Sequence, residues 1–568
     1  MSFKEEEPTT SAEYSTTEYN SSRWTRFKDS FKRAEEAEVN SGSSTNDLEA
    51  NSSSEGDLHR DLKNRHVQMI ALGGSIGTGL LIGSGGALSQ GGPASLVIAW
   101  GLVGTMVFCV IHALGELCVA FPVNGAFSTY ATRFIDQSWG FAVGWNYAIM
   151  WLFVLPLELV AAAMCITYWN DEINPASWVA IFYVFIYGIN IFGVKGYGEA
   201  EYYLTILKII AIVGFIILGV VLVCGGGPTH DFIGGRNWHV EKGAFANGFK
   251  GVATTFVTAS YSMAGSEMVG LASAETRNPR ETLPKAIRQV FWRLILFYFL
   301  SLTMISLLVP YNSPDLLGAG TSSTSPFVIA IKNGGIHALP SIFNACILIS
   351  ILSVGNSAVY GCSRTVQSLG LQGLAPQSFA YVDRKGRPLG GLALSALFGL
   401  LCFLAAYKNQ GTVFNWLLSV AGLATIFSWF NIALCHFRFR QALHAQGRSI
   451  EELTFTSVTG VFGSIYAMGF LLTVLGIQFW TALFPIGSKD ADAEHFFQNY
   501  LGAVVILVFY VGHKLYTRNW KICKSLNDID IDTGRRQVDL DLIRAELEEE
   551  KLLNKQKPLY KRIWNYWF

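Results

Sequence analysis

Residues 74–79 read Gly74-Ser75-Ile76-Gly77-Thr78-Gly79, and they interrupt an apolar run that extends from Val67 to about Leu88. The run has roughly the ~20 residues that a membrane-spanning helix needs. Each glycine weakens a helix by about 1 kcal/mol relative to alanine, so the clustered glycines predict an unwound segment. Unwound backbone at membrane depth persists only where it lines a cavity or lies buried in protein. The first span is therefore predicted to be broken at a binding site.

A broken span of this kind favours a negatively charged ligand. The N–H groups freed at the start of the second half-helix point at one spot, with the positive end of that half-helix's dipole behind them. The hydroxyl groups of Ser75 and Thr78 are expected to add hydrogen-bond donors. The alternative is that the spacings Gly73-x-x-x-Gly77 and Gly79-x-x-x-Gly83 only allow close helix packing.

The overall composition indicates a membrane protein. Of the 568 residues, 51% are hydrophobic and 15% are charged, whereas soluble domains carry about 25% charged residues. The 42 basic and 42 acidic residues balance, so nothing suggests a nucleic-acid partner. The 9 cysteines stand mostly singly in apolar runs, which favours neither a disulfide framework nor a metal site. With no Ser-His-Asp constellation discernible, we predict that the chain is not an enzyme and uses no cofactor.

A polar N-terminal tail, residues 1–62, precedes the apolar part and is expected to be disordered and cytoplasmic. The tail shows no signal peptide, so the first span itself is expected to direct insertion. About twelve apolar runs of spanning length follow and form a predicted membrane domain over residues 63–517. Their predicted bounds are Val67–Leu88, Pro93–Phe121, Trp139–Trp169, Ser177–Phe192, Leu204–Cys224, Phe249–Leu271, Val290–Val309, Leu339–Arg364, Leu389–Tyr407, Phe414–His436, Gly460–Phe484 and Tyr500–Tyr516.

Basic residues indicate the orientation of the spans. The loops after the even-numbered runs hold more arginine and lysine than the alternate loops, which places both termini in the cytoplasm. Residues 518–568 form a predicted cytoplasmic C-terminal tail with an amphipathic helix near Val538–Leu553. In the N-terminal tail, Lys4, Lys28 and Lys32 are candidate modification sites. The tails are expected to meet ubiquitin ligases or trafficking factors.

The sixth run is also interrupted, at Met263-Ala264-Gly265-Ser266-Glu267-Met268-Val269-Gly270. It lies five spans after the first, so it crosses the membrane in the opposite direction. Broken helices at corresponding positions of two oppositely oriented halves indicate an inverted-repeat transporter. The predicted halves cover residues 67–224 and 249–436, and two further helices occupy residues 460–516.

Ionisable residues inside the predicted spans are functional candidates, because a charge within a membrane is costly. Glu267 stands at the second break, where it could carry a proton, bind a cation or cap the broken helix. Just before this break, Tyr261 and Ser262 could offer backbone carbonyls to an ammonium group. Glu158 lies deep in the third run beside Pro156 and is a further candidate.

Two other charged residues, Lys208 and Glu116, lie near the predicted cytoplasmic ends of their runs. Lys208, in the fifth run, could load and release a proton or take the place of a fixed sodium ion. It could also reach solvent by snorkelling, since it lies near the cytoplasmic end of that run. Glu116 lies near the cytoplasmic end of the second run, where a salt bridge to a gate or loop arginine is favoured over a substrate contact.

Several stretches occur together in an order and at spacings typical of one family. They are Leu62–His66 leading into GGSIGTGLLIGSG, Gly115-Glu116-Leu117, Pro156-Leu157-Glu158-Leu159, SYSMAGSEMVGLASAETRNPRETLPKA (Ser260–Ala286) and GNSAVYGCSR (Gly355–Arg364). Over about Leu62 to Trp520 the chain thus resembles the fungal amino acid permeases of the amino acid–polyamine–organocation superfamily. The resemblance implies an all-α, twelve-helix fold of the LeuT type, with a 5+5 inverted repeat plus two helices. It also implies a plasma-membrane location and symport of amino acids with protons.

The resemblance further implies roles for individual residues. Lys208 matches a fifth-helix lysine that replaces a sodium ion in related bacterial proton-coupled members. The sequence SYSMAGSE is closer to broad-range or neutral permeases than to those dedicated to basic amino acids. The chain ends in Tyr566-Trp567-Phe568 where many relatives end in Phe-Trp-Cys, so lipidation of a terminal cysteine is not expected. The implied α-carboxylate site is Ser75, Ile76, Gly77, Thr78 and Gly79, and the implied α-amino contacts are Tyr261, Ser262 and Ala264 with Glu267 beside them.

We therefore predict a plasma-membrane transporter that imports L-amino acids, of broad range or neutral, together with protons. One alternative is a permease for γ-aminobutyrate or another amine; the carboxylate-binding break disfavours polyamines and choline but not γ-aminobutyrate. A second alternative is a sensor that binds amino acids with little transport. The presence of Glu267 and Lys208 favours transport over sensing.

Overall fold

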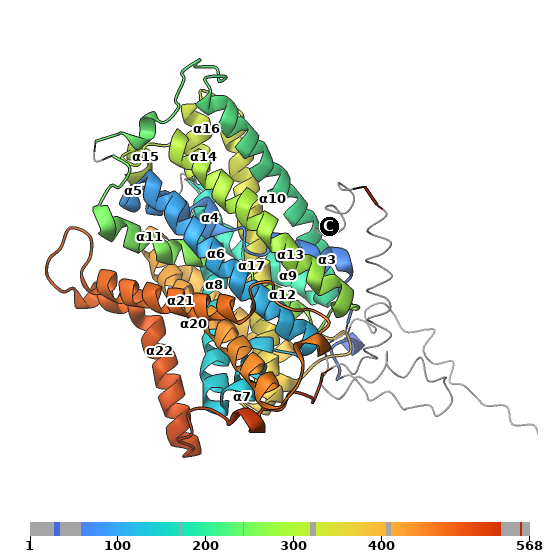
Figure 1. Ribbon diagram of the computed structural model, residues 1–568. Helices are drawn as coiled ribbons and strands as arrows, with labels where there is room; N and C mark the ends of the chain where they lie inside the picture. Colours follow the sequence, from blue (N-terminus) through green and yellow to red (C-terminus); the bar gives the residue numbers. More distant parts are fainter. Residues whose placement is uncertain are drawn as a thin grey trace, which may run out of the picture.

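The computed structural model describes residues 28–33, 58, 60–170, 172–241, 243–317, 325–404, 410–535 and 557–558. In these ranges the chain is helical, with two isolated β-bridges and no named strand (Figure 1). The amphipathic helix predicted near Val538–Leu553 lies outside the described residues, as does Lys4.

The predicted break in the first span is confirmed. Helix α3 (Asn64–Gly73) ends where the glycine-rich stretch begins, and helix α4 (Thr78–Leu81) starts four residues after Gly74. Helix α5 (Gly83–Gly91) continues the span, bent by 52° from the part that precedes it. Residues 74–77 thus form non-helical backbone in the middle of an apolar span.

Eight helices among the described residues are long and apolar enough to cross a membrane. The broken first span adds a ninth. Several of these helices extend beyond the apolar runs that hydropathy predicts. The eight are α6 (Pro93–Ala120), α8 (Gln137–Ile166), α10 (Gly193–Val223), α13 to α14 (Pro279–Arg293 and Ser301–Leu308, joined by a π-helix, Leu294–Leu300), α17 (Leu339–Leu371), α20 (Gln410–Ala445), α21 (Gly460–Leu483) and α22 (Ala493–Thr517).

The other three predicted spans are short or interrupted. Helix α9 (Pro175–Ile191) has 17 residues, and α18 (Leu389–Gly399) continues into a 3-10 turn, Leu400–Phe403. The sixth span consists of α11 (Gly248–Ser262) and α12 (Met268–Ala272), separated at the predicted second break. The second break is therefore confirmed as well, and twelve spans account for the apolar part of the chain.

Some predicted bounds are wrong. The fifth span begins at Gly193 rather than Leu204, and the seventh at Pro279 rather than Val290. In both cases charged residues in the first turns mask the helix from a hydropathy criterion. Three short helices, α7 (Ala126–Phe134), α15 (Pro314–Leu317) and α16 (Pro326–Asn333), lie in connections and were not expected from the sequence.

Helix α8 lies at the centre of the bundle. Of its most apolar 18-residue window, 83% is buried inside the protein, against 11% for α22. Helices α17 and α20 pack along α8, while α21 and α22 lie together at one side (Figure 1). This arrangement places α8 against both broken spans and leaves most of α22 on the outside of the bundle.

Parts of the two tails pack against the membrane domain. In the N-terminal tail, Tyr381 donates a hydrogen bond to the carbonyl oxygen of Phe31 (2.8 Å), and the Arg384 N–H group donates to that of Lys32 (2.9 Å). In the C-terminal tail, Ile529 and Ile531 are each 2% exposed. Disorder is therefore the wrong description for residues 28–33, and residues 518–535 lie against the bundle.

Candidate binding site at the two broken helices

The two breaks lie against each other at main-chain distance. Gly265 has a left-handed backbone (φ +88°), and a Cβ atom there would lie 2.8 Å from the carbonyl oxygen of Gly74. A Cβ atom on Gly79 would lie 2.5 Å from Cα of Ser262. These approaches require glycine, because any side chain would force the two segments apart. The glycines that unwind the helices thus also let them touch.

One tyrosine joins the two breaks. The hydroxyl group of Tyr298 lies 2.9 Å from the carbonyl oxygen of Ser262, and 3.0 and 2.9 Å from the carbonyl and hydroxyl oxygens of Ser75. Tyr298 lies in the π-helical segment of the seventh span and is fully buried. Its single hydroxyl proton lies within reach of both carbonyl oxygens, which the breaks leave without helical partners.

An arginine makes a second link between the breaks. Buried Arg293 donates to the carbonyl oxygen of Ala71 in α3 and to the hydroxyl group of Ser266 (2.6 Å). Arg293 lies at the end of α13, so the seventh span contacts both interrupted helices twice. The geometry of each break therefore depends on the seventh span.

A cavity of about 20 Å³ lies between the breaks. That volume is enough for about one water molecule. Its walls come from both interrupted helices, from the centre of α8 and from α17. The lining residues are Ser75, Gly77, Thr78, Gly79, Met150, Trp151, Val154, Glu158, Tyr261, Ser262, Ala264 and Val354.

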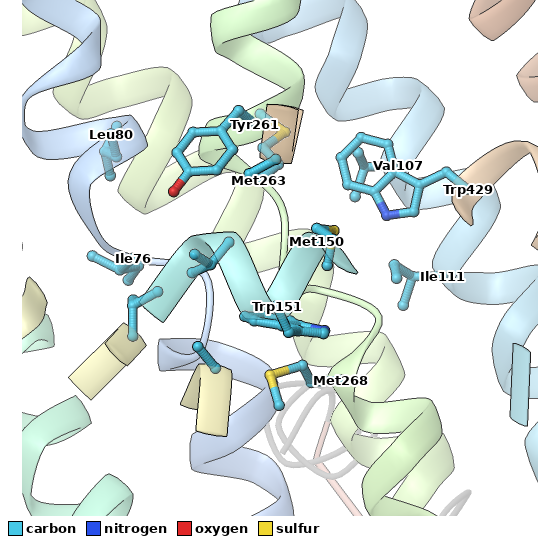
Figure 2. Close-up of a cluster of buried hydrophobic side chains, with 14 of the residues drawn as sticks. Ile76, Leu80, Val107, Ile111, Met150, Trp151, Tyr261, Met263, Met268 and Trp429 are labelled. Atoms are coloured by element: carbon cyan, nitrogen blue, oxygen red, sulfur yellow. The ribbon is translucent and has the colours of Figure 1, made fainter. Parts of the chain in front are cut away.

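The lining of the cavity combines polar and apolar groups. The polar groups are main chain at Gly77 and Gly79 and the carboxylate of Glu158. The apolar groups are the ring of Trp151 and three aliphatic side chains of α8 and α17. Figure 2 shows the ring of Tyr261 above the α8 segment that carries Met150 and Trp151. Such a mixed lining suits a small ligand that carries both charged and apolar groups.

Glu158 is the one cavity-lining residue with a formal charge. One carboxylate oxygen, Oε1, accepts hydrogen bonds from Thr78 (2.7 Å) and Tyr261 (3.3 Å). The other oxygen, Oε2, is buried and has no hydrogen-bond partner. We expected the Thr78 hydroxyl group to face a ligand, but it donates its hydrogen bond to Glu158. The free oxygen of Glu158 is therefore available to a ligand in the cavity.

Seven of the nine predicted substrate-binding residues line this cavity: Ser75, Gly77, Thr78, Gly79, Tyr261, Ser262 and Ala264. Ile76 and Glu267 do not. The side chain of Ile76 is buried in the apolar cluster drawn in Figure 2. Glu267 accepts hydrogen bonds from Trp429 (3.0 Å) in α20 and Tyr147 (3.3 Å) in α8, and is completely buried. Its carboxylate therefore bonds to side chains of neighbouring helices and does not line the cavity.

Lys208 lies away from the cavity but touches the first break. Its ammonium group donates to the carbonyl oxygen of Gly73 (2.8 Å) and to the hydroxyl group of Ser353 in α17 (2.8 Å). The side chain is 1% exposed, so the snorkelling alternative is wrong. The reason is the earlier start of α10 at Gly193, which puts Lys208 in the middle of the helix.

Glu116 forms an ion pair of the expected kind. Its Oε1 and Oε2 atoms lie 2.6 and 2.7 Å from the guanidinium nitrogens of Arg440 at the end of the tenth span. His436 of the same helix lies 3.2 Å from Oε1, and the Ser457 N–H group donates to Oε2. This cluster links α6 to α20 and does not reach the cavity.

The sequence did not indicate the apolar part of the site. Met150, Trp151, Val154 and Val354 are ordinary residues of spanning helices, and no local pattern distinguishes a cavity-facing side chain from one that faces another helix. Tyr298 was missed for the same reason. Tyrosine within an apolar run is typical of interfaces with the lipid headgroups, so its position alone suggested no contact with the breaks.

A second cavity, of about 520 Å³, opens beside the first. It lies between α5, α11, the start of α20 and the adjoining ends of α21 and α22. Its lining includes the polar residues Gln90, Thr254, Asn415, Gln478, His495 and Asn499. Tyr261 lines both cavities, so its ring forms the boundary between them.

The chain was compared with known proteins. The amino acid permease family model matches residues 66–525. Amino-acid permease GAP3 of Candida albicans is 76% identical over 566 residues, covering 96% of this chain and 94% of that protein. General amino-acid permease GAP2 of the same organism is 54% identical, covering 95% and 93%. General amino-acid permease GAP1 of Saccharomyces cerevisiae is 53% identical, covering 96% and 92%. The chain therefore belongs to the fungal amino acid permeases, a family of multi-pass membrane transporters and not of enzymes.

Proposed function

We propose that this permease imports L-amino acids across the plasma membrane by symport with protons, and that it accepts a broad range of neutral amino acids. The cavity between the two breaks is the observation that carries the proposal. Its lining combines main chain at Gly77 and Gly79 with the free oxygen of Glu158. A zwitterion needs both kinds of group, since its carboxylate seeks N–H donors and its ammonium group seeks acceptors.

The apolar residues of the cavity lining support a neutral side-chain preference. Met150, Trp151, Val154 and Val354 offer no charge to a lysine, arginine or acidic side chain. The large ring of Trp151 and the flexible side chain of Met150 can pack against substrate side chains of different size. Two of the relatives are called general amino-acid permeases, which also supports a broad range.

The small volume of the cavity fits a closed stage of the transport cycle. A neutral amino acid needs more space than about 20 Å³, so the site must widen to bind it. The larger cavity leads to Tyr261 from one side, and rotation of this ring would join the two spaces. On the other side, Glu116 with Arg440 and Glu275 with Arg364 hold the spans together. Import then consists of opening at Tyr261, closure, and release past these ion pairs.

Lys208 supports the coupling of transport to protons. Its ammonium group holds the carbonyl oxygen of Gly73, the last helical residue before the first break. Loss of the proton would remove a charge-assisted hydrogen bond from the binding site's own backbone. Glu158 and Glu267 are the other buried groups next to the breaks that could bind the coupled proton. We further propose that both termini face the cytoplasm, because the more basic loops lie on their side.

Uptake by permease-deficient yeast that expresses the chain tests this proposal. A labelled panel of neutral, basic and acidic amino acids and γ-aminobutyrate is offered at pH 4.5 to 7.5, with and without a protonophore. We expect uphill uptake of several neutral amino acids, stronger in acid and abolished by the protonophore. Uptake that ignores the protonophore would refute proton symport. Binding without accumulation would favour the sensor over a transporter. Uptake of γ-aminobutyrate alone would make the protein a γ-aminobutyrate permease.

A further inference from the structure

Glu201 lies beside Lys208 and is one of the most deeply buried charges of the protein. It is 0% exposed in α10, two helical turns before Lys208. Its Oε1 atom lies 3.6 Å from the Lys208 ammonium nitrogen and accepts a hydrogen bond from Thr205 (3.3 Å). Hydropathy predicts the start of this helix at Leu204, which puts Glu201 in a loop.

Ser353 of α17 connects the two charges. Its hydroxyl oxygen accepts a hydrogen bond from Lys208 (2.8 Å), and its hydroxyl proton is donated to Glu201 Oε2 (2.5 Å). The three groups form an unbroken hydrogen-bonded chain from ammonium to carboxylate. A hydroxyl group in this position can accept a proton on one side and give one up on the other.

The burial of this pair is not explained by stability. A buried ion pair is often no more stable than well-packed apolar residues of the same volume, since both charges lose their hydration. A buried charge within a membrane protein is therefore a candidate for proton or ion movement. Lys208 reaches the binding site through Gly73, whereas Glu201 has no contact with the cavity.

We propose that Glu201 accepts the coupled proton from Lys208 through Ser353 and passes it to the cytoplasmic side. The inference rests on the proton symport proposed above. Lys208 in its ammonium form donates a proton to the Ser353 oxygen while the Ser353 proton moves to Glu201. The products are a neutral amine, a regenerated hydroxyl group and a neutral carboxylic acid. Water on the cytoplasmic side then takes the proton and restores the carboxylate.

The direction of the route follows from the course of α10. The helix begins at Gly193, which lies against Arg387 in one of the basic loops assigned to the cytoplasm. Glu201 is closer to that end than Lys208 is. Helix α3 covers the pair, because the Thr205 hydroxyl oxygen lies 3.4 Å from the carbonyl oxygen of Met69 and close to Gly73. Movement of α3 away from α10 would expose Glu201 to water.

Other charged groups around the pair have their own partners. From α8, Glu158 acts on Lys208 electrostatically but is hydrogen-bonded to Thr78 and Tyr261. From α17, Arg364 pairs with Glu275. Tyr197 of α10 stacks on Tyr360 and bonds to Ser357. From α3, His66 lies 3.1 Å from Glu199. No other carboxylate among the described residues lies within ion-pair distance of Lys208.

The test separates net uptake from exchange. Net accumulation of substrate driven by a proton gradient requires the coupled proton to be released inside the cell. Exchange of labelled for unlabelled substrate does not require this release. We expect Glu201→Gln to lower pH-driven accumulation at least about tenfold, since it cannot accept the proton. Exchange should fall much less. Glu199→Gln is the matched control, because this carboxylate lies two residues away in the same helix but is partly exposed, and its accumulation should match the wild type.

Ser353 provides a second variant that leaves both charges in place. Ser353→Ala removes the hydroxyl relay and should slow net accumulation with exchange retained, and Ser353→Thr should restore it. Normal accumulation by either Glu201→Gln or Ser353→Ala would overturn the inference. Loss of exchange at normal surface abundance would also overturn it, by making Glu201 part of substrate binding. If a protonophore does not change wild-type uptake, the proposed proton symport is wrong, whatever the variants show.

Discussion

The hydroxyl group of Tyr298 lies 2.9 Å from the carbonyl oxygen of Ser262 and 3.0 Å from that of Ser75, so one side chain bridges the two interrupted spans. Both carbonyl groups belong to unwound or terminal backbone. In a membrane interior such groups must find partners within the protein. The binding site therefore depends on a residue that does not line it.

Replacing Tyr298 by phenylalanine tests this dependence. Tyr298→Phe keeps the ring but removes the hydroxyl group, which leaves buried acceptors unpaired at a cost of about 1–3 kcal/mol. We expect a lower thermal unfolding midpoint of the purified protein and a lower uptake rate. The control is Tyr203→Phe, because Tyr203 is 66% exposed. Equal midpoints for Tyr298→Phe and the wild type would show that the bridge is not needed.

The close approach at Gly79 gives a second prediction. In Gly79→Ala the new methyl group would lie 2.5 Å from Cα of Ser262, which is backbone and cannot rotate away. Since a displacement of about 1 Å near a reacting or binding group can cost roughly 100-fold, we expect uptake to fall by about 10- to 100-fold. Surface abundance, measured by labelling intact cells, should change much less.

Gly86→Ala is the matched control for this change. Gly86 lies in the same span, and nothing lies within 4 Å of a Cβ atom built on it. Alanine there should slightly favour the helix and leave uptake unchanged. Similar uptake by the Gly79 and Gly86 variants would mean that the two breaks do not need main-chain contact.

The ion pair of Glu116 with Arg440 predicts energetic coupling. Removing one partner of a buried pair leaves an uncompensated charge and costs about 3–5 kcal/mol. Glu116→Ala and Arg440→Ala should therefore each destabilise the protein strongly. The double variant should lose less than the sum of the two. Thermal unfolding of the wild type, the two single variants and the double variant in detergent measures the coupling. Strictly additive losses of stability would show that Glu116 and Arg440 are not energetically coupled.

A loop carboxylate gives a prediction about pH. Hydrogen bonds from Arg448 hold the pKa of Glu452 at about 2, below its ordinary value of 4.5. Arg535 of the C-terminal tail also pairs with Glu452 (3.2 Å). Because the folded-state pKa is lowered, the stabilisation is fully present above pH 4.5 and is lost as the pH falls toward 2.

Glu452→Gln checks the sign of this effect. The difference in unfolding midpoint between this variant and the wild type should be constant from pH 8 to about 5 and should shrink below about 4.5. Asp490→Asn is the control, because Asp490 is an exposed carboxylate in another loop. A difference that grows as the solution becomes acidic would contradict the assigned contacts.

Much of the site could be predicted because its cause is local. Glycine unwinds a helix wherever it is clustered, so the stretch Gly74 to Gly79 and the turn at Gly265 are visible in the sequence as breaks. The positions of Glu158 and Lys208 within apolar runs likewise identify them as costly charges that need partners. The inverted-repeat relation between the two halves stays a prediction.

The sequence by itself determined that this protein is a helical membrane transporter with two interrupted spans, because hydropathy and helix propensity act over a few consecutive residues. Tertiary structure alone decided which side chains face the cavity. Glu267 is at the second break yet bonds to Trp429 and Tyr147, while Trp151 and Val354 form the cavity wall. It also decided that Glu201 is a buried partner of Lys208 and not a loop residue. Glu267 meets Trp429 and Tyr147, and Ser353 joins Glu201 to Lys208, across more than a hundred positions of sequence, since packing assigns each side chain its neighbours.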